Sequence, residues 1–211
     1  MAAQRRTRPD ATRRSESSRR AILTAAFDLV GEVGYHRLSI EGIAARAGVG
    51  KQTIYRWWPS KGAVLFDAFL MLSEGGGTGA GGGGLPDTGD IEADLKSVLH
   101  ATVAETEDPL FEGPLRALSI EIAGDPALAG VYAERLGGPL REMKRERLRS
   151  AQRAGQLPAD LDLDIAIDLI WSPVFQRWLY RTEPLTREYT DRVVEAVLRG
   201  LGATGIGHPR S

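Results

Sequence analysis

The sequence contains no cysteine among its 211 residues, which excludes disulfides, thiolate metal sites and a cysteine nucleophile. Its three histidines, His36, His100 and His208, lie far apart and lack metal-ligand spacing. No apolar run approaches the roughly 18 residues that a membrane-spanning helix needs. The arginine-rich N-terminus also lacks the apolar stretch of a secretory signal. We therefore expect a cytoplasmic protein that holds no metal and no cofactor.

Side chains arranged for catalysis are also scarce. An enzyme built as a helical bundle would need a histidine beside a carboxylate or a Glu-x-x-His pair, and the sequence offers neither. The acidic cluster Glu105-Thr106-Glu107-Asp108 is typical of an exposed helix end. We expect no enzymatic activity.

Charge is distributed unevenly along the chain, although the formal net charge is only −1. Residues 1–64 contain 12 Lys and Arg against 5 Asp and Glu, whereas residues 65–211 contain 15 against 23. A basic block of this kind favours a polyanionic partner such as nucleic acid. Basic arms also bind membrane surfaces or keep proteins in solution, so charge alone leaves the partner open.

Helical patterns begin after an arginine-rich arm, residues 1–14, which we expect to be disordered and to help DNA binding without reading bases. Apolar residues then recur at steps of three and four, and serines that favour N-caps alternate with helix-ending glycines. This pattern predicts four helices, at Ser15–Val33, Ile40–Ala47, Lys51–Trp58 and Ser60–Leu72.

A glycine run, GGGTGAGGGG, follows the fourth helix and predicts a flexible linker at residues 75–88. It lacks the strand–helix context of a nucleotide-binding loop. Beyond it no segment has the pattern of a strand. Helices are expected after Asp90, after Pro109, over 127–154 with a bend or break at Gly137-Gly138-Pro139, over 163–180 and over 186–201. The sequence therefore predicts an all-α protein of about nine helices.

The second and third predicted helices form a helix-turn-helix between Ser39 and Trp58. A DNA major groove accepts one helix, and the small residues Ala44, Ala47 and Gly48 allow two helices to cross closely. Arg, Gln and Thr side chains suit base edges, whereas Lys and Tyr suit phosphates. We predict base readers at Gln52, Thr53 and Arg56, phosphate contacts at Ser39, Tyr55 and Lys61, either role for Lys51, and for Trp57 either a sugar–phosphate contact or surface packing.

The run SIEGIAARAGVGKQTIYRWWPSKGAVLFD, residues 39–67, resembles the N-terminal signature of the TetR/AcrR family of bacterial transcriptional regulators. About a dozen positions agree in order, including Ile43-Ala44, Ala47-Gly48-Val49, Thr53-Ile54-Tyr55 and Ser60-Lys61. Two positions depart from the family pattern: Gln52 stands where glycine is common, and Trp57-Trp58 where many members have His-Phe.

The resemblance implies a helix-turn-helix domain at 15–62, a larger C-terminal regulatory and dimerisation domain at 63–204, and a tail at 205–211. It also implies a homodimer formed by the last two helices, 163–180 and 186–201. The first of these carries more apolar residues than one small core needs, although burial within a single chain is the alternative. These residues are Ile167, Leu169, Ile170, Trp171, Val174, Phe175 and Trp178.

The resemblance further implies a small-molecule pocket in the C-terminal domain, and we expect an apolar or aromatic effector. The predicted lining residues, for each of which plain core is the more common role, are Phe66, Phe69, Leu99, Val103, Phe111, Leu118, Ile122, Trp171, Phe175 and Trp178. The function so predicted is that of a repressor that releases a palindromic DNA operator when ligand binds. The alternative is a helix-turn-helix regulator without a small-molecule effector, controlled by a protein partner or constitutive.

Overall fold

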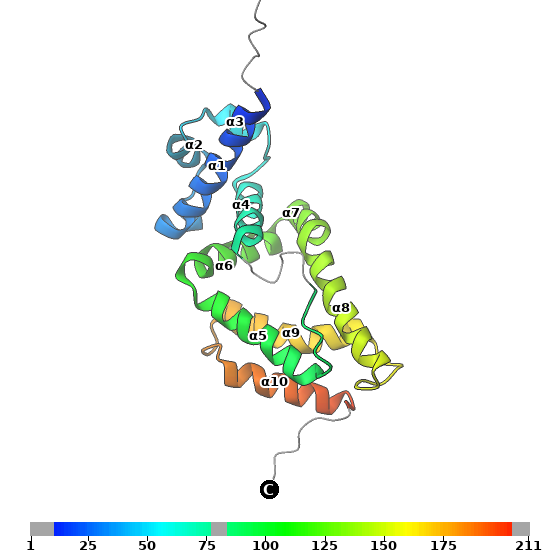
Figure 1. Ribbon diagram of the computed structural model, residues 1–211. Helices are drawn as coiled ribbons and strands as arrows, with labels where there is room; N and C mark the ends of the chain where they lie inside the picture. Colours follow the sequence, from blue (N-terminus) through cyan, green and yellow to red (C-terminus); the bar gives the residue numbers. More distant parts are fainter. Residues whose placement is uncertain (1–10, 77–83, 204–211) are drawn as a thin grey trace, which may run out of the picture. The chain divides into compact units, whose positions relative to one another are not determined.

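The structure, a computed structural model, describes residues 11–76 and 84–203, and every regular element in these two ranges is helical (Figure 1). With the interrupted stretch from α7 to α8 counted as one, the described residues form nine helices, which confirms the predicted all-α fold. The helices are α1 (Ala11–Val33), α2 (Ile40–Ala47), α3 (Lys51–Tyr55), α4 (Lys61–Gly76), α5 (Ile91–Glu107), α6 (Pro109–Gly124), α7 (Pro126–Tyr132), α8 (Gly138–Arg153), α9 (Leu163–Tyr180) and α10 (Arg187–Gly200).

The chain divides into two compact units, and each is described by itself. The first, which we call the head, comprises Met1–Leu72 with Gly113–Glu121. Its helices α1 and α2 pack together, and α2 packs on α3. The fully buried side chains Ile22, Ile43 and Ile54 contribute one apolar anchor from each of these helices. Removing such side chains from water is the main stabilising term for elements as short as α2 and α3.

Several helix limits in the head differ from the prediction. α1 begins at Ala11, four residues before Ser15, so the end of the predicted disordered arm is helical; residues 1–10 lie outside the described residues. α3 ends at Tyr55 instead of Trp58. The turn continues irregularly, since the amides of Trp57 and Trp58 both donate to the Ile54 carbonyl at 2.9 and 3.0 Å. α4 runs four residues past Leu72, into the predicted linker.

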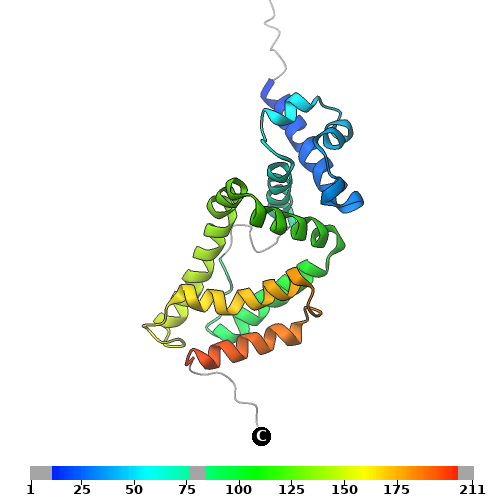
Figure 2. The ribbon, with the colours of Figure 1, turned by 180° about the vertical axis from the view of Figure 1, so that it is seen from behind.

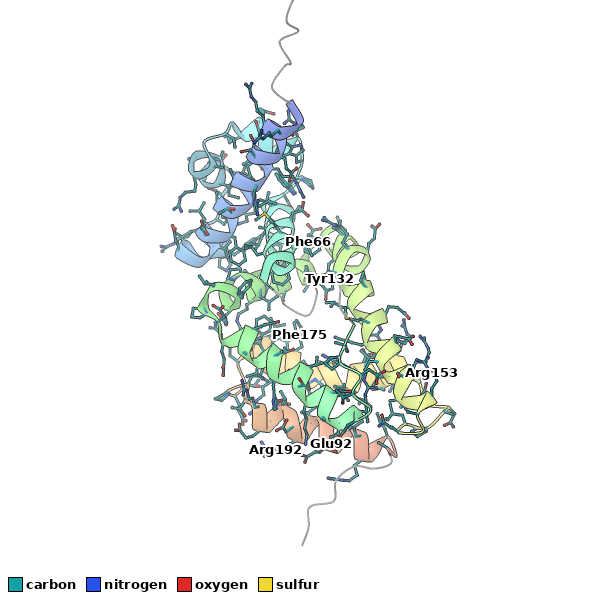
Figure 3. The ribbon with its side chains drawn as sticks, viewed as in Figure 1. Phe66, Glu92, Tyr132, Arg153, Phe175 and Arg192 are labelled. Atoms are coloured by element: carbon teal, nitrogen blue, oxygen red, sulfur yellow. The ribbon has the colours of Figure 1, made fainter. Side chains whose placement is uncertain are left out.

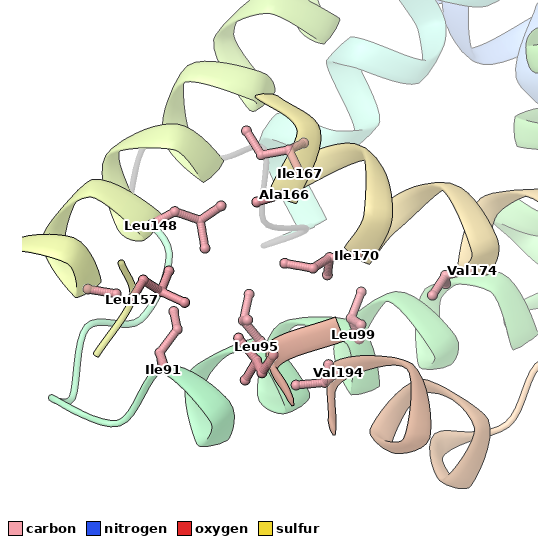
Figure 4. Close-up of a cluster of buried hydrophobic side chains, with 12 residues drawn as sticks. Ile91, Leu95, Leu99, Leu148, Leu157, Ala166, Ile167, Ile170, Val174 and Val194 are labelled. Atoms are coloured by element: carbon pink, nitrogen blue, oxygen red, sulfur yellow. The ribbon is translucent and has the colours of Figure 1, made fainter. Parts of the chain in front are cut away.

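The second unit, which we call the body, comprises Ser73–Glu112 with Ile122–Ser211. In it α10 packs against α5 and α9, and α8 packs against α9; Figure 2 shows α9 and α10 side by side. A buried apolar cluster fills the space between these helices (Figure 4). The cluster contains Ile91, Leu95, Leu99, Leu148, Ala151, Leu157, Ala166, Ile167, Ile170, Val174, Val194 and Leu198.

The last residues of the predicted flexible linker are held in place by a buried ion pair. Asp94 of α5 and Arg147 of α8 are both buried, and Arg147 Nη2 donates to Asp94 Oδ2 at 2.6 Å. Thr88 donates to the same carboxylate through its amide (2.9 Å) and its hydroxyl (2.7 Å). Arg147 Nε also donates to the Pro86 carbonyl at 2.7 Å. These contacts fix residues 86–88 in the structure, residues 77–83 lie outside the described residues, and the flexible linker stays a prediction.

The predicted bend at Gly137-Gly138-Pro139 takes the form of a π-helical segment, Ala133–Gly137, between α7 and α8. Both glycines are needed there. A Cβ on Gly137 would lie 2.7 Å from Cε1 of Tyr132, and one on Gly138 would lie 2.7 Å from the carbonyl oxygen of Ala133. The wider π turn therefore fits at residues 137 and 138 because neither residue has a Cβ.

Candidate nucleic-acid interface

The turn between α2 and α3 is built from local signals. Ser39 caps α2, because its Oγ accepts the Gly42 amide at 3.1 Å. Gly48 ends α2 in the left-handed region, with φ 67° and ψ 33°, where a residue with a Cβ is strained. The Val49 amide then donates back to the Ala44 carbonyl at 3.0 Å, which closes the helix end. Only three residues, 48–50, therefore separate α2 from α3, in the sharp turn that a helix-turn-helix requires.

Asp67 of α4 fixes the segment that directly follows α3. Trp58 is buried, and its Nε1 donates to Asp67 Oδ2 at 2.9 Å. Arg19 of α1 donates to the same oxygen at 3.1 Å. One carboxylate thus joins α1, the segment after α3, and α4. Sequence patterns gave no sign of this role for Asp67, because it depends on groups 9 and 48 residues away.

The predicted DNA-contacting residues lie together on and beside α3. Lys51, Gln52, Tyr55 and Arg56 are exposed, and the Tyr55 side chain keeps 51% of its surface accessible. The remaining four, Ser39, Thr53, Trp57 and Lys61, are half-buried. Ile54 faces the opposite way and is fully buried. α3 therefore presents one polar face and anchors itself with the other.

Lys51 is paired in the free protein with a residue that sequence reasoning missed. Its Nζ lies 2.9 Å from Oε1 of Glu41 on α2. The hydrogen bond from Lys51 lowers the pKa of Glu41, and the same bond raises the pKa of Lys51. Both side chains are more than half exposed, so the pair is open to solvent and to competition from phosphate.

Lys61, a predicted phosphate anchor, is engaged within the head. Its Nζ donates to the carbonyls of Tyr35 and Leu38 at 3.0 and 3.1 Å and lies 4.2 Å from the centroid of the Tyr35 ring. These carbonyls belong to the connection between α1 and α2. Since an ammonium group has three donor hydrogens, one is left for a phosphate.

Trp57, for which the sequence left two roles open, is half-buried at the surface of the head. Its ring meets that of Trp58 edge-on with centroids 5.4 Å apart, and the Arg56 guanidinium lies 5.0 Å from its centroid. A cation over an indole face is a favourable contact. The predicted base reader Arg56 therefore rests on Trp57 in the DNA-free protein.

A groove of about 470 Å³ opens elsewhere on the head, along α1 and the end of α2. Arg20, Asp28 and Arg46 are its charged lining residues. Arg46 also pairs with Glu32 of α1 through both guanidinium ends, at 3.0 and 2.7 Å, which holds α2 against α1. None of the predicted effector-binding residues lines this groove.

The predicted effector-binding residues are divided between the two units. Phe66, Phe69 and Leu118 belong to the head. The others belong to the body, where Leu99, Val103 and Trp178 are buried, Phe111, Ile122 and Trp171 are half-buried, and Phe175 is 48% exposed. Leu99 is a member of the body's core cluster. A pocket that contains all ten residues therefore stays a prediction.

The apolar excess of α9 is explained in part by the body's own core. Ile167, Ile170, Val174 and Trp178 are buried within the chain, so these four of the seven predicted interface residues serve the monomer. Leu169 and Phe175 are exposed, and so are Ile165 and Tyr180, which the prediction did not include. Ile165, Leu169 and Phe175 lie on the side of α9 away from the core, among the exposed polar residues Asp168, Ser172 and Gln176. We refer to these three apolar residues as the exposed stripe.

Within the described segments, no three residues of the metal-ligating types come together as a cation site. None of the helices in these segments has the length and apolar character that a membrane span requires.

Comparisons with known proteins agree with this geometry. The sequence model described as bacterial regulatory proteins, tetR family, matches residues 22–68, and the model described as tetracyclin repressor-like, C-terminal domain, matches residues 85–197. The chain is 33% identical over 196 residues to the HTH-type transcriptional regulator YdeS of Bacillus subtilis (strain 168), covering 90% of this chain and 93% of that protein.

Two further relatives extend the comparison. The DNA-binding transcriptional repressor TetR of Mycobacteroides abscessus is 27% identical over 188 residues, which cover 88% of this chain and 94% of that protein. The crystal structure of the TetR family transcription regulator SCO0332 superposes with a TM-score of 0.68 at 33% identity, and the match covers 87% of this chain and 98% of that one.

Proposed function

The chain belongs to the TetR family of DNA-binding transcriptional regulators, and we propose that it is a homodimeric, ligand-responsive repressor that acts on a palindromic operator in the cytoplasm. The observation that carries the DNA-binding part is the composition of α3. Its polar face presents Lys51, Gln52, Tyr55 and Arg56, while Ile54 anchors the helix from behind. Gln52 and Arg56 read bases, Thr53 adds a methyl contact, and Tyr55, Lys61 and the free amides at the N-terminus of α2, beside Ser39, hold phosphates.

The exposed stripe of α9 supports the homodimer. Ile165, Leu169 and Phe175 leave an apolar face on a helix that already packs its other side into the body's core. Exposed large apolar residues on one side of a helix support a protein interface there. A second copy of the chain covers it in our proposal, and α9 with α10 forms the interface.

Repression and response to a ligand are supported by the family and by the connection of α4. One relative is described as a transcriptional repressor. The head is tied to α4 through Asp67 and Lys61, and the chain leaves the head along this helix. A ligand that favours one placement of α4 changes the separation of the two recognition helices, which must match about one turn of DNA, and so changes operator affinity.

Fluorescence anisotropy with the DNA that flanks the protein's own coding region tests this function. We expect one fragment to bind more tightly than unrelated DNA of equal length, and footprinting to show two symmetric half-sites. Adding a panel of small apolar molecules should release the fragment in at least one case. No preference among fragments would contradict the DNA-binding part, and a preference that no compound alters would contradict the ligand response.

A further inference from the structure

Lys144 differs from every other basic residue of α8. Arg141, Arg145, Arg147, Arg149 and Arg153 each lie within ion-pair distance of at least one carboxylate. For Lys144, no carboxylate oxygen of the described chain lies within the 4.0 Å that defines such a pair. Its Nζ instead lies 4.4 Å from the centroid of the Trp171 ring on α9.

Lys144 stands on the inner side of α8. It lies one turn before Arg147 and Leu148, both of which are buried, and it is half-buried itself. Trp171, also half-buried, packs against the core cluster of the body. The cation and the indole face therefore lie at the border of this core, where the charge of Lys144 is shielded from water only in part.

The charge of Lys144 lacks compensation at this place. Its pKa is lowered to about 8, chiefly by burial and also by the neighbouring charge of Arg141, and Asp168 opposes both effects only in part. The two nearby carboxylates are already paired with Arg141, because Asp164 Oδ1 and Asp168 Oδ1 each lie 2.8 Å from a guanidinium nitrogen of that residue. At neutral pH Lys144 is still mainly a cation, and it offers three donor hydrogens.

We propose that Lys144 and Trp171 form an anion-recognising contact in the body, whose ligand is an organic acid with an apolar or aromatic part. The acid group pairs with the Lys144 ammonium, and the apolar part lies against the Trp171 ring. Charge-assisted hydrogen bonds are about twice as strong as neutral ones, and an apolar aromatic face favours a hydrocarbon partner. The inference rests on the proposed function, because it names the chemical class of the effector.

Calorimetric titration with matched probes tests this contact. The probes are 4-phenylbutyrate with 4-phenylbutanamide and octanoate with octanamide, since the members of each pair differ in charge and share one apolar body. We expect the full-length protein to bind each acid about tenfold more tightly than its amide. Lys144→Met should abolish that preference and Lys144→Arg should keep it. Arg153→Met is the matched control, because Arg153 lies on the same helix, is exposed and pairs with Glu146 (Figure 3).

Three results would overturn the contact: equal binding of acid and amide, an acid preference that survives in Lys144→Met, or no binding of any of the four probes. Circular dichroism of each variant separates loss of binding from loss of fold. The operator and footprinting experiments do not involve Lys144. A negative calorimetric result therefore leaves the proposed DNA-binding function in place, and a negative operator-binding result does not alter the calorimetric result.

Discussion

Among single side chains, Lys61 has a structural role in the head and a proposed role at the DNA, and two measurements on one variant can separate them. It holds the carbonyls of Tyr35 and Leu38, and it keeps one donor hydrogen for a phosphate. Lys61→Met should therefore lower the free energy of unfolding by about 1 kcal/mol and weaken binding to all DNA sequences alike. The slope of log K against log salt should fall by about one. Thermal unfolding measures the change in stability, and anisotropy at several salt concentrations measures the change in DNA binding. An unchanged melting temperature would show that the two carbonyl contacts do not stabilise the head.

Arg56 is expected to behave differently. It rests on Trp57 in the free protein, and its guanidinium can pair with a base through two hydrogen bonds. Arg56 directly follows α3, and Arg56→Ala should weaken operator binding by about 1–3 kcal/mol and relax base preference at one position of each half-site. Anisotropy with single-base operator variants measures this. Equal losses on operator and unrelated DNA would assign Arg56 to the phosphates.

Lys144 gives a stability that depends on pH. Its pKa is about 8 in the folded chain, against an ordinary value of 10.5. Between these values the unfolded chain holds the proton and the folded chain has released it, so stability rises with pH across this window. Relative to Lys144→Met, the wild type should gain about 1 kcal/mol from pH 8 to pH 10, because solvent screens part of the full shift. Urea unfolding of both proteins at each pH isolates this lysine from the others; a constant difference would contradict the lowered pKa.

At the scale of helices, the pair Asp94–Arg147 joins α5 to α8 and anchors the segment before α5. Both side chains are buried, and burial, which raises the pKa of Asp94, is outweighed by hydrogen bonds from Arg147 and Thr88, so the pKa lies below its ordinary value. Arg147→Met leaves a buried carboxylate without its cation and should lower the free energy of unfolding by about 3–5 kcal/mol. The matched control Arg153→Met removes an exposed pair and should change it by less than about 1 kcal/mol. Similar values for both variants in urea unfolding would contradict this account.

The limits of most helices could be predicted from the sequence because caps are local. Ser39, Asp90 and Thr186 each accept the amide three residues ahead, as the pattern of polar residues before apolar ones indicates. Contacts between distant residues could not be predicted in this way. Asp67, Glu41 and Arg147 resemble ordinary surface charges in the sequence, and their roles depend on how helices cross. The excess of apolar residues on α9 was visible, but only the fold separates core from exposed face.

For the whole molecule, the proposed homodimer depends on the outer face of α9. The exposed stripe of Ile165, Leu169 and Phe175 is the surface that we assign to the subunit contact. Leu169→Arg places a charge at its middle without touching the buried residues Ile167 and Ile170, so the monomer should stay folded. We expect light scattering to show a monomer and circular dichroism to show unchanged helix content.

Loss of the dimer should also lower the affinity for the operator. A monomer binds one half-site at a time and loses the joint contribution of the second recognition helix, so affinity for the full operator should fall by about a hundredfold or more. Affinity for an isolated half-site should hardly change, because α3 is untouched. Leu110→Arg on α6 is the control, since Leu110 is an exposed apolar residue on another helix. If Leu169→Arg stays dimeric while Leu110→Arg becomes monomeric, the subunit contact lies on another face of the body.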